Sequence, residues 1–223
     1  AAPFDEANFT PEERRMIDDF SEKIDITDST TILGFGASAQ KKIADFSDTA
    51  LNGVRNKDFS EVGTMITNLI GQRKLENLKV KYDKVEDSVN EISGILQNHQ
   101  ITLLKDIAMF DNLYEVNMTY FKELSMYILA GKKKLARERE VTLTALQEKA
   151  RMSGLPEDAQ AANDFAEQCV RFERKIHDLE LTRMVSIQMA PQIRLVQNND
   201  TMMTEKIQTV IMNTLPLWKS QMV

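Results

Sequence analysis

The sequence predicts an all-α protein, an elongated helical bundle built on a long antiparallel coiled-coil hairpin with shorter amino-terminal helices packed against it. Breakers of helices are few, with eight glycines and five prolines in 223 residues. Residues 75–152 hold no proline and only two glycines. Apolar residues recur there at alternating spacings of three and four, and they do so again over residues 162–187. This spacing is typical of helices that each bury one narrow stripe against a partner.

The first expected helix begins at Thr10, where the segment Thr10–Pro11–Glu12–Glu13 matches a capping box, and it runs to about Ile24. Asp28 or Ser29 is expected to cap a second helix over residues 30–54. Its apolar set is Ile32, Leu33, Ile43, Phe46, Ala50 and Val54.

Two glycines interrupt this second helix, Gly34 and Gly36. A phosphate-binding loop would need a third glycine and a preceding strand. The pair therefore indicates close helix packing or a local kink. A further helix is expected over residues 59–70, capped by Asp58 and ended by Gly71.

The hairpin itself is expected to turn at Gly154, with Pro156 starting the returning helix. A short connection between long helices makes them antiparallel neighbours, so facing residues should have numbers that add to about 308. Pro191 and Pro216 should each kink the helix or open one turn. The expected stripes are Leu75, Leu78, Tyr82, Val85, Val89, Ile92, Leu96, His99, Leu103, Ile107, Phe110, Leu113, Phe121, Leu124 and Ile128, and then Ala162, Phe165, Cys169, Phe172, Ile176, Leu179, Arg183 and Ile187.

We therefore predict two parts within one continuous structural unit. Residues 1–71 form short helices that pack on the hairpin, and residues 72–223 form the hairpin. The carboxyl-terminal segment ends in an amphipathic pattern without a cap, so we expect the hairpin to be truncated there.

Composition excludes several classes of function. The net charge of −6 argues against general nucleic-acid binding. The single cysteine, Cys169, lies on an apolar face and is expected to be a buried small hydrophobe. His99 and His177 lie too far apart for a zinc or di-metal site. Without a spanning segment, a leader pattern or a cofactor motif, we expect a cytoplasmic protein with no metal, no cofactor and no enzymatic activity.

Polar residues converge at one place if the predicted register holds. Buried polar groups need partners, so such a cluster is either a device that fixes helix register or a site for a small ligand, cation or oxyanion. The residues of this candidate site are Asp106, Asp111, Asn112, Asn198, Asn199 and Asp200.

A basic patch is the second candidate site, formed by Lys132, Lys133, Lys134 and Arg137. It could bind an anionic partner or an anionic membrane surface. Alternatively, it is a solvated helix face whose charges pair with Glu138 and Glu140. We favour the solvated face, because alternating charge on a long helix usually serves solubility.

Four segments resemble the toxic-anion-resistance family of TelA-like tellurite-resistance proteins. They are residues 40–58 (QKKIADFSDTALNGVRNKD), 99–135 (HQITLLKDIAMFDNLYEVNMTYFKELSMYILAGKKKL), 177–200 (HDLELTRMVSIQMAPQIRLVQNND) and 213–223 (NTLPLWKSQMV). Family members carry a longer connector near residues 70–72 and continue beyond Val223. The resemblance implies a bacterial, cytosolic role in stress and tellurite tolerance, and it supplies no catalytic residues.

We therefore expect a non-enzymatic stress-resistance protein that acts as a helical scaffold for protein partners. Reduction of an oxyanion would need thiols or a redox cofactor, which one cysteine does not supply. The alternatives are a small-ligand or ion-binding protein that uses the polar cluster, and a peripheral membrane effector that uses the basic patch. Self-association is compatible with each of these.

Overall fold

The structure is a computed structural model that describes residues 9–55 and 78–221. Within these ranges the chain is helical and contains no strand, which confirms the all-α prediction. The elements are α1 (Pro11–Lys23), α2 (Ser29–Gly34), α3 (Ala37–Arg55), α5 (Leu78–Arg137), η3 (Glu138–Leu143), α6 (Thr144–Ser153), α7 (Pro156–Thr209), η4 (Val210–Thr214) and α8 (Leu215–Gln221). The predicted helix over residues 59–70 and its end at Gly71 lie outside the described residues.

The chain forms two compact units, which are described separately. Unit 1 comprises Ala1–Ser47 and Val116–Ala190, and unit 2 comprises Asp48–Glu115 and Pro191–Val223. The predicted boundary between residues 71 and 72 stays a prediction, because it lies outside the described residues.

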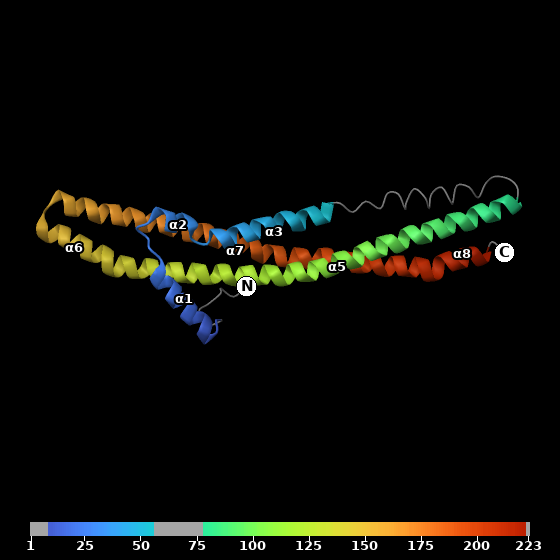
Figure 1. Cartoon of the computed structure of the whole chain (residues 1–223), viewed down its shortest axis with the longest axis horizontal. Coiled ribbons are helices and arrows are strands. Elements are labelled where there is room, and N and C mark those ends of the chain that lie inside the picture. Colours follow the sequence, from blue (N-terminus) through green and yellow to red (C-terminus); the bar gives the residue numbers. More distant parts are fainter. Residues whose placement is uncertain (1–8, 56–77, 222–223) are drawn as a thin grey trace. The chain divides into compact units, whose positions relative to one another are not determined.

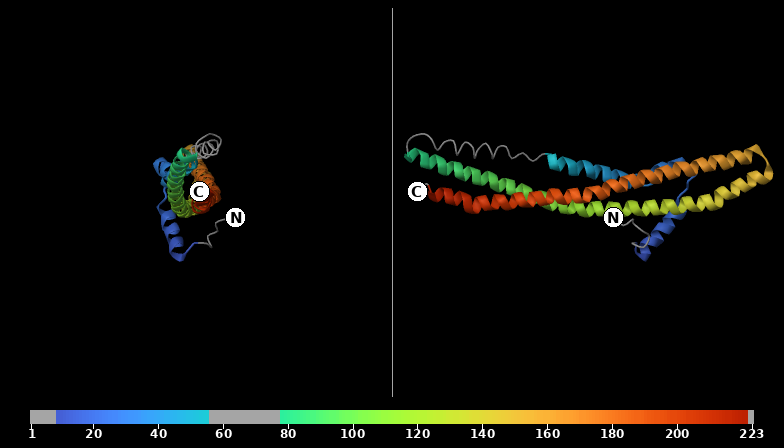
Figure 2. Two further views of the ribbon diagram at one scale, coloured as in Figure 1. Left: turned by 90° about the vertical axis from the view of Figure 1, so that its right-hand side faces the viewer. Right: turned by 180° about the vertical axis from the view of Figure 1, so that it is seen from behind.

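Unit 1 is centred on a pair of antiparallel helices. The second half of α5, together with η3 and α6, lies beside the first part of α7 (Figures 1 and 2). Gly154 ends α6 with φ of 64°, a left-handed conformation that favours glycine, at the predicted turn. Predicted stripe residues fill the core between the helices: Phe121, Leu124, Ile128, Ala162, Phe165, Cys169, Phe172, Ile176 and Leu179.

Helix α1 begins with the predicted capping box. The Thr10 hydroxyl accepts from the Glu13 amide at 3.2 Å, and the Glu13 carboxylate accepts from the Thr10 amide at 3.0 Å. Ile17 is buried against the core of unit 1, and Phe20 contacts the Tyr127 ring edge-to-face at 5.1 Å. One apolar face thus holds α1 against α5.

The helix predicted over residues 30–54 is instead two helices, α2 and α3. Asp28 caps α2 as predicted, accepting from the Thr30 amide. The chain then breaks at Gly36, which has φ of 66°. A Cβ at this position would lie 2.7 Å from Leu179 Cδ1, so the glycine permits both the turn and a close approach to α7. The kink was predicted, but the full break was not.

Unit 2 pairs the first part of α5 with the last part of α7, η4 and α8. One cluster of its buried residues comprises Val89, Ile92, Leu96, Leu103, Ile207 and Leu215, with Trp218 packed against them. Gln100 donates to Gln208 at 2.7 Å and Lys219 donates to Asn90 at 2.6 Å, and the numbers in each pair add to about 308. The predicted antiparallel register therefore holds in this unit.

Prolines and π-helical turns interrupt the regular hydrogen bonding. α7 continues through Pro191. The wider turn η4 comes directly before Leu215 and Pro216, where the missing proline N–H leaves a carbonyl without its helical donor. Pro216 therefore lies beside an opened turn, as predicted.

Two predicted stripe positions are wrong. Leu33 is 73% exposed and Ile187 is 43% exposed, whereas Ser186, next to Ile187, is fully buried. The stripe of α7 moves by one residue because Ser186 finds a polar partner inside the helix pair, as described below.

We predict that Gly36→Val destabilises the protein by about 2–4 kcal/mol, because valine disfavours positive φ and its side chain overlaps the buried Leu179. Urea denaturation followed by circular dichroism measures this change. Gly34→Ala is the matched control: nothing lies within 4 Å of its Cβ position, and Gly34 has an ordinary helical conformation. Equal effects of the two substitutions would contradict the proposed role of Gly36.

Candidate functional site

One member of the predicted polar cluster, Asp111, takes part in a network with residues of α7 in unit 2. The Arg194 Nη1 atom donates to Asp111 at 2.7 Å and to Gln197 Oε1 at 2.6 Å. Gln197 donates in turn to the Ile107 carbonyl at 3.2 Å. The network thus joins the side chain of Gln197, which is 7% exposed, to the surface of α5.

Aromatic stacking also holds the Arg194 side chain. Its guanidinium carbon lies 4.0 Å from the centroid of the Tyr114 ring, within the range of a cation–π contact. Hydrogen bonding by the Gln197 side chain, followed by that of Arg194, lowers the pKa of Asp111. Asp111 therefore remains a carboxylate at neutral pH, and Arg194 is held in one orientation.

The other residues of the predicted cluster divide between the helix interface and solvent. Asp200 is 5% exposed and Asp106 is half-buried. The three amides, Asn112, Asn198 and Asn199, are all exposed. In residues 9–55 and 78–221, no group of three or more His, Cys, Asp and Glu residues could hold a metal ion. The use of these six residues as a ligand site stays a prediction.

Sequence reasoning missed Arg194 and Gln197. Gln197 could have been found from the sequence, because Ile193, Gln197 and Asp200 follow the spacings of four and three that mark one face of a helix. All three are buried in the structure. Arg194 carried no such signal, since two of its partners, Asp111 and Tyr114, lie on another helix.

A second polar pair, Asn117 and Ser186, lies in the interior of unit 1. Asn117 Nδ2 donates to the Ser186 carbonyl at 2.9 Å, and the Ser186 hydroxyl donates to Asn117 Oδ1 at 2.8 Å. Both residues are at most 1% exposed. Both hydrogen bonds join α5 to α7 in the interior, so this pair fixes the axial register of the two helices in unit 1.

The basic patch is occupied by carboxylates of the same unit. Lys132 pairs with Glu180 of α7 at 2.5 Å and Lys134 pairs with Glu138 at 2.9 Å. The other two bases reach α1, where Lys133 pairs with Asp18 at 2.9 Å and Arg137 with Glu22 at 3.8 Å. Glu138 was a predicted partner, whereas the acids of α1 and α7 were not. The patch therefore helps to attach α1 to α5.

We predict that Asn117→Leu lowers stability by about 1–3 kcal/mol, because it removes the Oδ1 acceptor of the buried Ser186 hydroxyl and the Nδ2 donor to the Ser186 carbonyl. Ser186→Ala removes only the hydroxyl that donates to Asn117 Oδ1 and keeps the backbone carbonyl that accepts from Asn117 Nδ2, so it should cost less. The double variant should cost less than the sum of the two, which urea denaturation of all four proteins measures as a double-mutant cycle. Strictly additive costs would show that the two side chains act independently.

We also predict a pH-dependent attachment of α1. Hydrogen bonding to Lys122, which lies 2.5 Å from Glu13, lowers the pKa of Glu13. A carboxyl whose pKa falls on folding stabilises the protein above its unfolded pKa, and this contribution is lost as pH falls through the folded pKa.

The thermal midpoint of Lys122→Met should therefore lie below that of the wild type at pH 7, and the two should converge at acidic pH. Arg151→Met is the control, because Arg151 pairs with Glu148 only three residues away and does not attach one helix to another. A difference that persists unchanged at acidic pH would contradict the role of Glu13.

Comparisons with known proteins identify a family model and several relatives that match this chain. The family model described as toxic anion resistance protein (TelA) matches residues 17–72 and 70–223. A TelA-like protein from Staphylococcus epidermidis is 34% identical over 242 residues, which cover 97% of this chain and 64% of that protein. A TelA-like protein from Staphylococcus saprophyticus is 35% identical over 241 residues, with the same coverage.

The chain thus spans just under two thirds of the length of these curated relatives. No solved structure matches it. None of the described helices is both long and apolar enough to cross a membrane. The match of the family model over nearly the whole chain, together with relatives of this identity, places the chain in the toxic anion resistance (TelA) family.

Proposed function

We propose that this chain is a cytoplasmic, non-enzymatic part of a toxic-anion resistance system, and that it acts as a helical, coiled-coil scaffold for other proteins. Family membership supports the link to toxic anions. The scaffold role rests on one observation about the surface of α7.

That observation is a row of large apolar side chains on the outer face of α7 in unit 1. Leu181, Met184 and Val185 follow spacings of three and four residues within the helix, and they are 50%, 55% and 45% exposed. The buried residues Leu179 and Ser186 lie on the opposite side of the same helix. A helix that carries apolar residues on both sides has a second face available for a partner helix.

The charged residues of unit 1 support the same proposal. Long-range ion pairs such as Lys132–Glu180 and Arg139–Glu173 connect its own helices. These pairs use their charges to hold the helices of unit 1 together. The outer apolar row of α7 is therefore the better candidate for contact with another protein.

A survival assay tests this proposal. The chain should raise the tellurite tolerance of a sensitive bacterial strain that lacks its own family member. The triple variant Leu181→Ser, Met184→Ser and Val185→Ser should lose most of this effect, because the apolar row is removed while the buried core is kept. Met152→Ser is the matched control, since Met152 is 75% exposed and lies at the hairpin turn. Equal tolerance with the triple variant, shown to be folded by circular dichroism, would contradict the scaffold role.

Oxyanion binding in unit 2 is the second candidate, and the orientation of Arg194 favours it. Nη1 carries the bonds to Asp111 and Gln197, while Tyr114 supports the guanidinium plane. The remaining guanidinium N–H groups have the geometry to donate to a planar or tetrahedral oxyanion. A rise in the thermal midpoint with tellurite that Arg194→Met abolishes would support this candidate, whereas an unchanged midpoint in the wild type would exclude it.

A further inference from the structure

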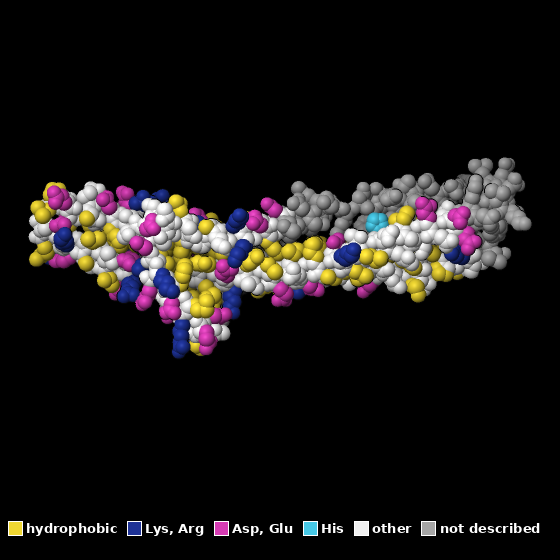
Figure 3. All heavy atoms as spheres, viewed as in Figure 1, with side chains coloured by type: hydrophobic (Ala, Val, Ile, Leu, Met, Phe, Trp, Pro, Cys, Tyr) yellow, Lys and Arg dark blue, Asp and Glu magenta, His cyan; other side chains and the backbone are white. Residues whose placement is uncertain are grey.

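Helix α1 carries both acids that pair with α5 and apolar side chains that are exposed. Its acids Glu13, Asp18 and Glu22 pair with bases of α5. Met16 and Phe20 lie one helical turn apart and are 60% and 37% exposed, although the Phe20 ring also contacts Tyr127. Exposed apolar side chains therefore lie beside the contact that holds α1 in place (Figure 3).

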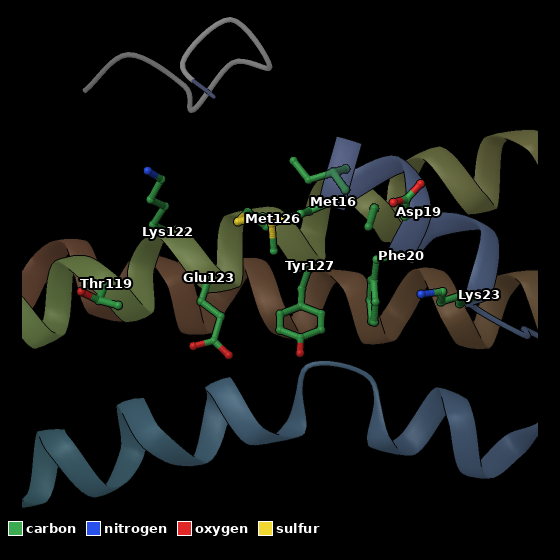
Figure 4. Close-up of a pocket in the computed structure, with 11 residues that line it drawn as sticks. Met16, Asp19, Phe20, Lys23, Thr119, Lys122, Glu123, Met126 and Tyr127 are labelled. Carbon is green, nitrogen blue, oxygen red and sulfur yellow. The ribbon is translucent and has the colours of Figure 1, made fainter. Parts of the chain in front are cut away.

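A groove runs between this side of α1 and α5, with a volume of about 560 Å³. Met16 and Phe20 form one wall, and Met126 and Tyr127 form the other. Figure 4 shows the rings of Phe20 and Tyr127 next to each other. Methionine side chains adapt to the shape of a partner, and Met, Tyr and Phe are enriched at protein interfaces. The lining thus suits another apolar helix face.

Charges of both signs stand at the edge of the groove. Lys122 and Glu123 are already paired within unit 1, with Glu13 and Lys42 respectively. Asp19 and Lys23 are exposed, and neither makes an ion pair in the described part of the chain. A partner that complements this edge must carry a base opposite Asp19 and an acid opposite Lys23, one helical turn apart and next to apolar residues.

We propose that the occupant of this groove is α1 of a second copy of the chain, in a two-fold symmetric dimer. Two α1 helices that run antiparallel bring Asp19 of each copy opposite Lys23 of the other, because a two-fold interface repeats every contact. The same arrangement packs Met16 and Phe20 of one copy into the groove of its partner. Helix α1 thus supplies both the apolar side chains and the complementary charges that suit the groove of a second copy.

Charge reversal tests the proposal on the intact chain, with sedimentation equilibrium over a wide range of concentration. The wild type should dimerise. Asp19→Lys and Lys23→Glu should each raise the dissociation constant of the dimer by roughly tenfold or more, because each places like charges opposite one another. A one-to-one mixture of the two variants should form heterodimers, since every like-charge contact then becomes an opposite-charge contact.

The mixture distinguishes a contact between two copies from an effect within one helix. Association is restored in the mixture only if the two residues meet across the interface, because a second chain cannot reverse an intrahelical effect. Met16→Ser should also weaken the dimer, and Met152→Ser is its matched control, because Met152 is an exposed methionine at the hairpin turn, away from α1. Circular dichroism establishes that each variant is folded. A wild type that stays monomeric, a mixture that does not associate, or a dimer lost with Met152→Ser but kept with Met16→Ser would overturn the proposal.

Discussion

The buried pair of Asn117 and Ser186 is the constraint on which the arrangement of unit 1 depends. Apolar stripes alone permit two helices to slide by a turn, because one leucine or phenylalanine packs much like the next. The reciprocal hydrogen bonds of this pair are satisfied in only one alignment. That alignment in turn places Lys132 beside Glu180 and Arg139 beside Glu173. The surface ion pairs therefore follow from the helix register that the buried pair sets.

Attachment of the amino-terminal helices combines apolar burial with specific charge pairing. Phe35 illustrates the apolar part, because it packs between Tyr127 of α5 and Phe172 of α7. It also lies 3.0 Å from the Cβ position of Gly131, so a larger residue there would press on the ring. Polar contacts then direct α3, since Gln40 accepts from Lys175 and donates to Thr182. Short helices that bury little surface alone are thus fixed by the pair of long helices beneath them.

Much of the fold could be predicted from the sequence because it depends on local signals. The capping box at Thr10, the cap at Asp28 and the left-handed Gly154 each act within one helical turn. The stripe of α7 was correct up to Leu179 and failed at Ile187, because a serine is buried there by a partner that lies far away in the sequence. The break at Gly36 depends similarly on the approach of Leu179.

The candidate sites were less predictable, since their character is set by which side chains meet across helices. The basic patch is recognisable in the sequence as consecutive basic residues. Three of the four acids that pair with it, however, come from α1 and α7. Of the residues from 197 to 200, Asn198 and Asn199 are exposed, whereas Gln197 and Asp200 are buried. An error of one residue in helical phase is enough to exchange those roles, since each residue turns the helix by about 100°.

Burial of Cys169 has a consequence for the redox chemistry of the chain. Its side chain is 1% exposed, and desolvation raises the pKa of its thiol. Oxidants attack the thiolate form, so a thiol that is both covered and protonated reacts slowly. Burial thus shields the single thiol of the chain from oxidants in solution.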